Sequence, residues 1–240
     1  MKHLFILAGT DFKLIFRDPS LRAFLFFPIM LFAIIIWFVP SLIEKYEILE
    51  DYIPLFIMVG AVENTQMFSF ISSMVLIDEK ETQVAQMYGI VPLSRIQFLL
   101  FRLLIPYSFT VLLNVILLLT QPFVHISFIY ILLISILTAL IVPAYVLGIN
   151  SIVKNRMEGM IYIKAFNMLV LVPFAAFFVP ENFKHVFGFL PTHWILQSIE
   201  LVSIESPQNG NLLLFLLIGF VFFAGVIYWL ARSFFKKHFS

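Results

Sequence analysis

The sequence predicts an all-α, polytopic membrane protein with six transmembrane helices, and composition and segment length are the observations that predict it. Hydrophobic residues make up 62% of the chain and charged residues only 12%, whereas a typical soluble domain has about 25% charged residues. So few charges cannot cover a folded surface in water, but a bilayer does not require that cover. Six segments have about the 20 mostly apolar residues that a helix needs to cross the hydrocarbon core. They lie at about residues 23–39, 52–77, 103–120, 126–149, 161–179 and 212–231 of a single membrane domain, 1–240.

The segments outside these spans differ in character. Residues 1–20 mix apolar and charged positions, which is typical of a helix lying in the membrane interface. Pro19 is expected to end that helix, because a proline disfavours helical structure at the preceding residue. The first span is expected to stop at Pro40. The external connection at residues 180–211 is too apolar for a solvated loop, so a helix from Thr192 to Val202 is expected to dip into the outer leaflet.

The distribution of basic residues predicts the orientation. With six spans and both termini in the cytoplasm, 13 of the 15 Lys and Arg residues fall on the cytoplasmic side, and only Lys45 and Lys184 lie outside. This is the distribution that the positive-inside rule describes. We therefore expect a multi-pass protein of the cell membrane, of the bacterial inner-membrane type, with both termini cytoplasmic.

Motifs for catalysis or nucleotide binding are missing from the sequence. It has no P-loop, HExxH, GxSxG or GxGxxG pattern. It also has no cysteine, and its five histidines are scattered, so neither a thiolate nucleophile nor a zinc site is expected. We therefore expect no enzyme activity, no metal and no cofactor in this chain, and no nucleic-acid partner.

A family resemblance rests on short motifs in a fixed order. The connection between the second and third spans holds DEKET at residues 78–82, MYGIVPLSR at 87–95 and FLLFR at 98–102. FRDP at 16–19 precedes the first span, and FVP at 178–180 and LPTH at 190–193 mark the outer connection. In this order, and with six spans, the chain resembles the ABC-2 type permeases, which are the membrane subunits of ATP-driven exporters. The resemblance covers essentially the whole chain, although family members often have a glycine soon after the acidic-basic stretch, where Thr82 and Gln83 stand.

The resemblance implies partners and a mechanism. Two permease subunits, identical or different, would pair in the lipid bilayer, and two separate ATPase subunits holding ATP and Mg²⁺ would bind beneath them. A cytoplasmic coupling helix from Glu79 to Tyr88 would sit in a cleft of the ATPase and pass its rigid-body motion into the second span. The charge pattern alone favours a simpler alternative, in which the charged residues 78–81 only end a membrane helix and face water. The residues implied in coupling are Asp78, Glu79, Lys80, Glu81, Thr82, Met87 and Tyr88.

A polar strip interrupts the second span. A carboxylate inside a span, such as that of Glu63, costs on the order of several kcal/mol and usually faces a cavity or a partner. Helical spacing places further polar residues near the same face. We expect the strip to line the translocation path or the subunit interface; alternatively, Glu63 lies at the outer headgroups or is protonated and bonded to a neighbour such as Asn167. The strip comprises Glu63, Gln66, Ser69 and Ser73, with Asn167 from the fifth span.

The predicted function is export of a hydrophobic or amphipathic, drug-like small molecule or a lipid, driven by the separate ATPase. Two alternatives come from other classes. A proton-coupled secondary transporter using Glu63 predicts more ionisable residues within the spans and inverted repeats, and the sequence shows neither. A membrane-embedded lipid-modifying enzyme predicts paired carboxylates or histidines near one membrane face, and none are so arranged.

Overall fold

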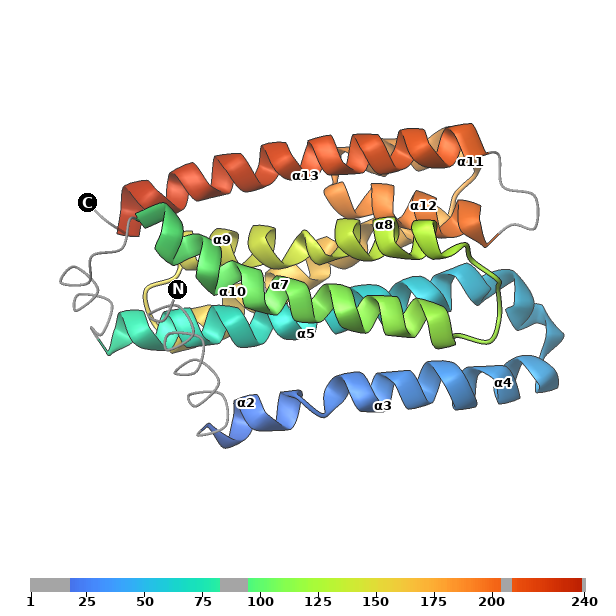
Figure 1. Cartoon of the computed structure of the whole chain (residues 1–240), viewed down its shortest axis with the longest axis horizontal. Helices are drawn as coiled ribbons and strands as arrows, with labels where there is room; N and C mark the ends of the chain where they lie inside the picture. The colour runs from blue at the N-terminus through green and yellow to red at the C-terminus, as the bar shows by residue number, and fades with distance from the viewer. Residues whose placement is uncertain (1–17, 83–94, 204–208, 239–240) are drawn as a thin grey trace.

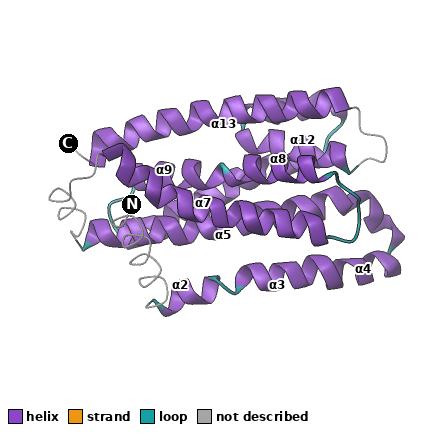
Figure 2. Ribbon diagram, viewed as in Figure 1, coloured by secondary structure: helices purple, strands orange, loops and turns teal. Residues whose placement is uncertain are grey.

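The computed structural model describes residues 18–82, 95–203 and 209–238, and the regular elements within these residues are all helical (Figure 1, Figure 2). Six helical segments are long and apolar enough to span a membrane, which confirms the predicted all-α class with six spans. Residues 1–17 of the predicted interfacial helix lie outside the described residues. The six spans are Leu21–Lys45, Glu47–Glu81, Arg102–Thr120, Phe128–Ile152, Arg156–Phe178 and Asn211–Lys236.

The first span continues beyond the proline at which it was expected to stop, so that expectation was wrong. It consists of α2 (Pro19–Phe24), α3 (Phe27–Ala33), a π-helix (Ile34–Phe38) and α4 (Val39–Lys45). The backbone N–H of Val39 bonds to the Ile34 carbonyl, five residues earlier. This widened turn restarts the helix at Val39, so Pro40 stands at a first-turn position, where a missing N–H costs no intrahelical bond.

The next three spans pack against one another. A 3-10 turn (Glu47–Tyr52) leads into α5 (Ile53–Glu81), which passes through the polar strip without a break. The third span is α7 (Arg95–Thr120), and the fourth is divided into α8 (Phe128–Ala139) and α9 (Ile141–Ile152) by a turn at Leu140. Pro143 accounts for that division, because it has no N–H to donate to the Ala139 carbonyl.

The last two spans flank the predicted external helix. The fifth span is α10 (Arg156–Leu171), which becomes a 3-10 helix (Val172–Phe178) at Pro173. After α11 (Glu181–Lys184) and a second 3-10 helix (His185–Phe189), α12 (Pro191–Val202) packs against α5, α8 and α13 (Asn209–His238). The helix expected between Thr192 and Val202 is therefore present, and it lies inside the bundle (Figure 1).

Burial separates two central spans from four peripheral ones. In the most apolar stretch of each span, 61% of α5 and 78% of α8–α9 are buried, compared with 22% or less in the other four spans. The outer faces of the peripheral spans carry large apolar side chains such as Phe26 and Trp37. Such faces are suited to lipid, so the bundle presents an apolar surface around a protein-filled centre.

A buried ion pair joins the second and third spans at one end of the bundle. Arg102 of α7 donates to the carboxylate of Glu79 in α5 at 2.5 Å, and both side chains are nearly inaccessible. We call this end, at the left in Figure 1, the charged end; Asp18, Asp78 and Arg156 also lie there. The pair fixes the end of α5 against the start of α7.

Removing one partner of this pair is expected to destabilise the subunit. Arg102→Gln removes the positive charge that bonds to the buried Glu79 carboxylate, and removing one partner of a buried ion pair typically costs about 3–5 kcal/mol. The double variant Glu79→Gln/Arg102→Gln should recover most of the loss, because neither neutral amide leaves an unpaired charge. Thermal unfolding of the purified protein in nanodiscs, followed by near-UV circular dichroism, measures both effects.

Arg232→Gln serves as the control, because Arg232 is an exposed arginine of α13. Its melting temperature should equal that of the wild type. An Arg102→Gln variant that melts together with this control would contradict a structural role for the ion pair.

Candidate functional site

The polar side chains in the middle of α5 bond to neighbouring groups within the protein. Asn64 Nδ2 donates to Asn114 Oδ1 of α7 at 2.8 Å, and Asn114 Nδ2 donates to the Thr65 hydroxyl at 3.0 Å. The Thr65 hydroxyl in turn donates to the Ala61 carbonyl at 2.7 Å. All three polar side chains are fully buried. This network fastens the second span to the third far from the charged end.

The strip predicted around Glu63 faces the neighbouring helices of the same subunit. Gln66, Ser69 and Ser73 are buried, and the Ser69 hydroxyl donates to the Thr65 carbonyl at 2.8 Å. Gln66 Nε2 lies 3.5 Å from the backbone carbonyl of Asn167 in α10, so these two predicted residues are brought together. The strip is closed by protein in this conformation, and its role along a translocation path stays a prediction.

Tyr145 links the strip to α9, and sequence analysis did not single it out. Its hydroxyl donates to Asn167 Oδ1 at 2.6 Å, and its ring meets Phe166 edge to face with centroids 5.6 Å apart. Glu63 is half-buried and close enough to Tyr145 to interact with it electrostatically. One alternative was that Glu63 bonds to Asn167. Among the described contacts, however, the Asn167 side chain bonds to Tyr145 instead.

Three segments of the chain meet at Arg156, the first residue of α10. Its guanidinium bonds to the carboxylate of Asp18, which precedes α2, and lies 3.6 Å from the carboxylate of Asp78 in α5. Its backbone N–H donates to Glu81 at 2.9 Å, and Lys80 Nζ donates to the Val153 carbonyl at 2.7 Å. The end of α5 is therefore tied directly to the start of α10. We call this set of contacts the Arg156 tether.

A glycine lets the two helices approach each other at the tether. A Cβ atom on Gly159 of α10 would come within 2.8 Å of Ile77 Cδ1 of α5, closer than packed side chains normally allow. Asn155 starts α10 at this point, because its side chain accepts from the Glu158 backbone N–H at 2.9 Å. Local capping and close packing thus place Arg156 against α5.

The residues expected to contact an ATPase begin in this tethered region. Glu79 is buried against Arg102, Asp78 and Lys80 are half-buried, and Glu81 and Thr82 are exposed. Glu79 to Glu81 form the last turn of α5, where a separate coupling helix was expected to begin. Met87 and Tyr88 lie outside the described residues. The role of the whole segment in coupling stays a prediction.

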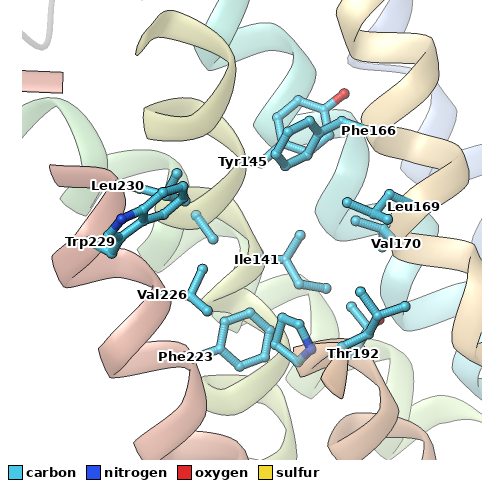
Figure 3. Close-up of a pocket in the computed structure, with 13 residues that line it drawn as sticks. Ile141, Tyr145, Phe166, Leu169, Val170, Thr192, Phe223, Val226, Trp229 and Leu230 are labelled. Carbon is cyan, nitrogen blue, oxygen red and sulfur yellow. The ribbon is translucent and has the colours of Figure 1, made fainter. Parts of the chain in front are cut away.

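An apolar pocket of about 170 Å³ lies between α9, α10, α12 and α13 (Figure 3). Its lining is almost entirely apolar and includes four aromatic rings. Sequence analysis did not predict it, because its walls come from residues up to about 90 positions apart in the chain. The lining includes Ile141 and Tyr145 of α9, Phe166 and Val170 of α10, Thr192 of α12, and Phe223, Val226 and Trp229 of α13.

Comparison with known proteins identifies the family. A family model described as "Fluoroquinolones export permease protein Rv2686c-like" matches residues 11–231. No match is found among curated proteins or among solved structures. The family match takes in the first five membrane-spanning helices, the sixth as far as residue 231, the Arg156 tether and the aromatic pocket. Because it extends over nearly the whole chain, this multi-pass membrane protein belongs to the Rv2686c-like family of export permeases.

Proposed function

We propose that this chain is the permease subunit of an ABC-2 type exporter that moves a drug-like, amphipathic aromatic molecule out across the membrane. The observation that carries this proposal is the match of residues 11–231 to a family described as fluoroquinolone export permeases. Fluoroquinolones join an aromatic ring system to polar groups, so they belong to the class of cargo that the apolar spans predict. Six apolar helices and a buried central pair of spans are suited to such a transport role.

A partner subunit supplies the energy in this proposal. The chain has no phosphate-binding loop, whereas the motif order around residues 78–102 resembles that of permeases driven by a separate ATPase. Two permease subunits would pair, with the charged end on the cytoplasmic side and two ATPase subunits beneath it. The gathering of basic residues at that end supports this orientation.

The Arg156 tether gives this exporter a path for coupling. The segment proposed to contact the ATPase, Glu79 to Tyr88, begins in the last turn of α5. Because Arg156, Glu81 and Lys80 fasten α5 to the start of α10, a displacement of α5 carries α10 with it. α10 is also one wall of the apolar pocket, so the displacement changes the shape of that pocket. This is rigid-body transmission between packed elements.

A proton-coupled transporter remains the second candidate, and one observation favours it. Glu63 is a half-buried carboxylate within a span, close to Tyr145 and to the strip of buried polar side chains. Intramembrane carboxylates of this kind occur in proton relays. The source of energy separates the two candidates.

Transport is expected to depend on ATP. Inside-out vesicles holding the permease with its co-purifying ATPase should accumulate norfloxacin only when ATP is supplied. Replacing the P-loop lysine of the ATPase should abolish accumulation, because that lysine binds the phosphates. Collapse of the proton gradient should leave accumulation unchanged. Accumulation driven by a pH gradient without ATP would instead establish the proton-coupled alternative.

Glu63→Gln is expected to preserve folding and ATP dependence while changing the pH dependence of norfloxacin transport. The reason is that the amide keeps the size of the carboxyl but cannot change its charge. Initial transport rates across a pH series measure the effect. Glu44→Gln, at an exposed position of α4, is the control. Identical pH profiles for both variants and the wild type would remove Glu63 from the transport path.

Arg156→Gln is expected to uncouple ATP hydrolysis from export. Norfloxacin transported per ATP should fall on the order of tenfold, a typical coupling factor, while ATPase activity of the assembled complex continues. Parallel assays of phosphate release and transport on the same vesicles provide this ratio. Lys154→Gln changes an exposed basic residue two positions earlier and should keep the wild-type ratio. A normal ratio in Arg156→Gln would show that the tether does not transmit motion.

A further inference from the structure

We propose that the pocket between α9, α10, α12 and α13 binds the uncharged aromatic part of the transported molecule and receives it from the bilayer. This inference rests on the proposed export function and assigns that function a binding site. The residues that carry it are Tyr145, Phe166, Phe223, Val226 and Trp229 (Figure 3).

The pocket opens sideways, toward the surface that faces lipid. Its floor is α9, where Ile141 and Tyr145 are almost fully buried. Its sides are α10 and α13, which do not pack closely against each other. Leu169 on α10 is 46% exposed and Trp229 on α13 is 68% exposed. Both residues belong to membrane-spanning segments, so a molecule entering between them comes from the hydrocarbon region and not from water.

The chemistry of the lining selects an uncharged ligand. The Tyr145 hydroxyl already donates to Asn167 at 2.6 Å, so it adds no free donor to the pocket. Almost all of the surface that the other lining residues present to the pocket is hydrocarbon or aromatic carbon, and their only further side-chain polar groups are the Trp229 indole N–H and the Thr192 hydroxyl, neither of which is charged. A charged group would lose its hydration there without gaining a partner. The carboxylate or ammonium of an amphipathic drug therefore stays outside, at the mouth.

The size and aromatic character of the pocket favour a ring over an acyl chain. Tyr145 and Phe166 already meet edge to face, and Phe223 and Trp229 line the opposite side (Figure 3). Ring edges and faces attract each other beyond the gain from buried area. A dry cavity of about 150 Å³ accommodates benzene, and this pocket has about 170 Å³. The start of α12 at Thr192 closes one end, which suits a compact ring better than a long chain.

Photolabelling of the permease alone tests the assignment. The purified protein in nanodiscs, without ATPase or ATP, is exposed to two diazirine probes with ten-carbon groups, one naphthyl and one straight-chain decyl. Labelled peptides are then mapped by mass spectrometry. The naphthyl probe is expected to label α10 and α13 around the pocket, and the decyl probe to label the outer faces without preference for the pocket.

Two pairs of matched variants locate the binding. Val226→Phe fills the pocket and should reduce naphthyl labelling there at least tenfold, whereas Val221→Phe adds the same ring at a position of α13 that is 72% exposed and should change nothing. Trp229→Leu should also weaken labelling. Trp37→Leu, which removes a tryptophan that is 73% exposed on the first span, should not. The second pair keeps the test decisive if Val226→Phe fails to fold.

The outcomes separate this inference from the proposed function. Equal naphthyl labelling in Val226→Phe and Val221→Phe, or labelling of the pocket by the decyl probe alone, would overturn the aromatic site even if ATP-driven export is demonstrated. Pocket labelling that Val226→Phe and Trp229→Leu both reduce would support the site even if ATP-driven export fails.

Discussion

Helices that lie in lipid gain little from hydrophobic contact with one another, because lipid tails are as apolar as their side chains. Close packing, together with polar and ionic contacts, therefore decides how such helices are placed. In this subunit two sets of ionic contacts gather at the charged end. The buried Glu79–Arg102 pair joins the second span to the third, and Arg156 joins the fifth span to the second and to the segment before the first. α5 takes part in both sets of contacts, and it also packs against α3, α7, α9, α10 and α12.

Away from the charged end, the helices of several spans become less regular. The Asn64–Asn114 hydrogen bond still fixes α5 to α7. Prolines interrupt the neighbouring spans, however, with a break between α8 and α9 and a 3-10 segment after α10. The aromatic pocket lies between α10 and α13 and takes in Ile141, which follows the break between α8 and α9. Since α10 and α13 do not pack closely against each other, the pocket can change shape while the Arg156 tether holds.

The sequence predicted the helices well and their contacts poorly. Apolar length alone located six spans, and the helix expected from Thr192 to Val202 is present as α12, because such signals are local. The stop expected at Pro40 was wrong because a π-helix, which leaves no clear sequence signal, places the proline in a first turn. Arg156 was counted only as an orientation signal, and Arg102 only as that and as the end of the FLLFR motif, since nothing in their spacing reveals that Glu79 and Asp18 lie beside them. The pocket was missed for the same reason, as its aromatic walls converge only in the folded chain.

If the Arg156 tether transmits motion, the distances across it stay constant while the mouth of the pocket changes shape. Distances between spin labels test it directly, because the chain has no native cysteine and accepts label pairs without background. One pair joins the exposed positions Thr82 and Lys154 across the Arg156 tether, and the other joins Met168 and Tyr228 on the exposed faces of α10 and α13. During ATP turnover by the assembled complex, the Thr82–Lys154 distance should stay constant and the Met168–Tyr228 distance should change. A constant distance at the mouth, together with a changing distance across the tether, would contradict the account.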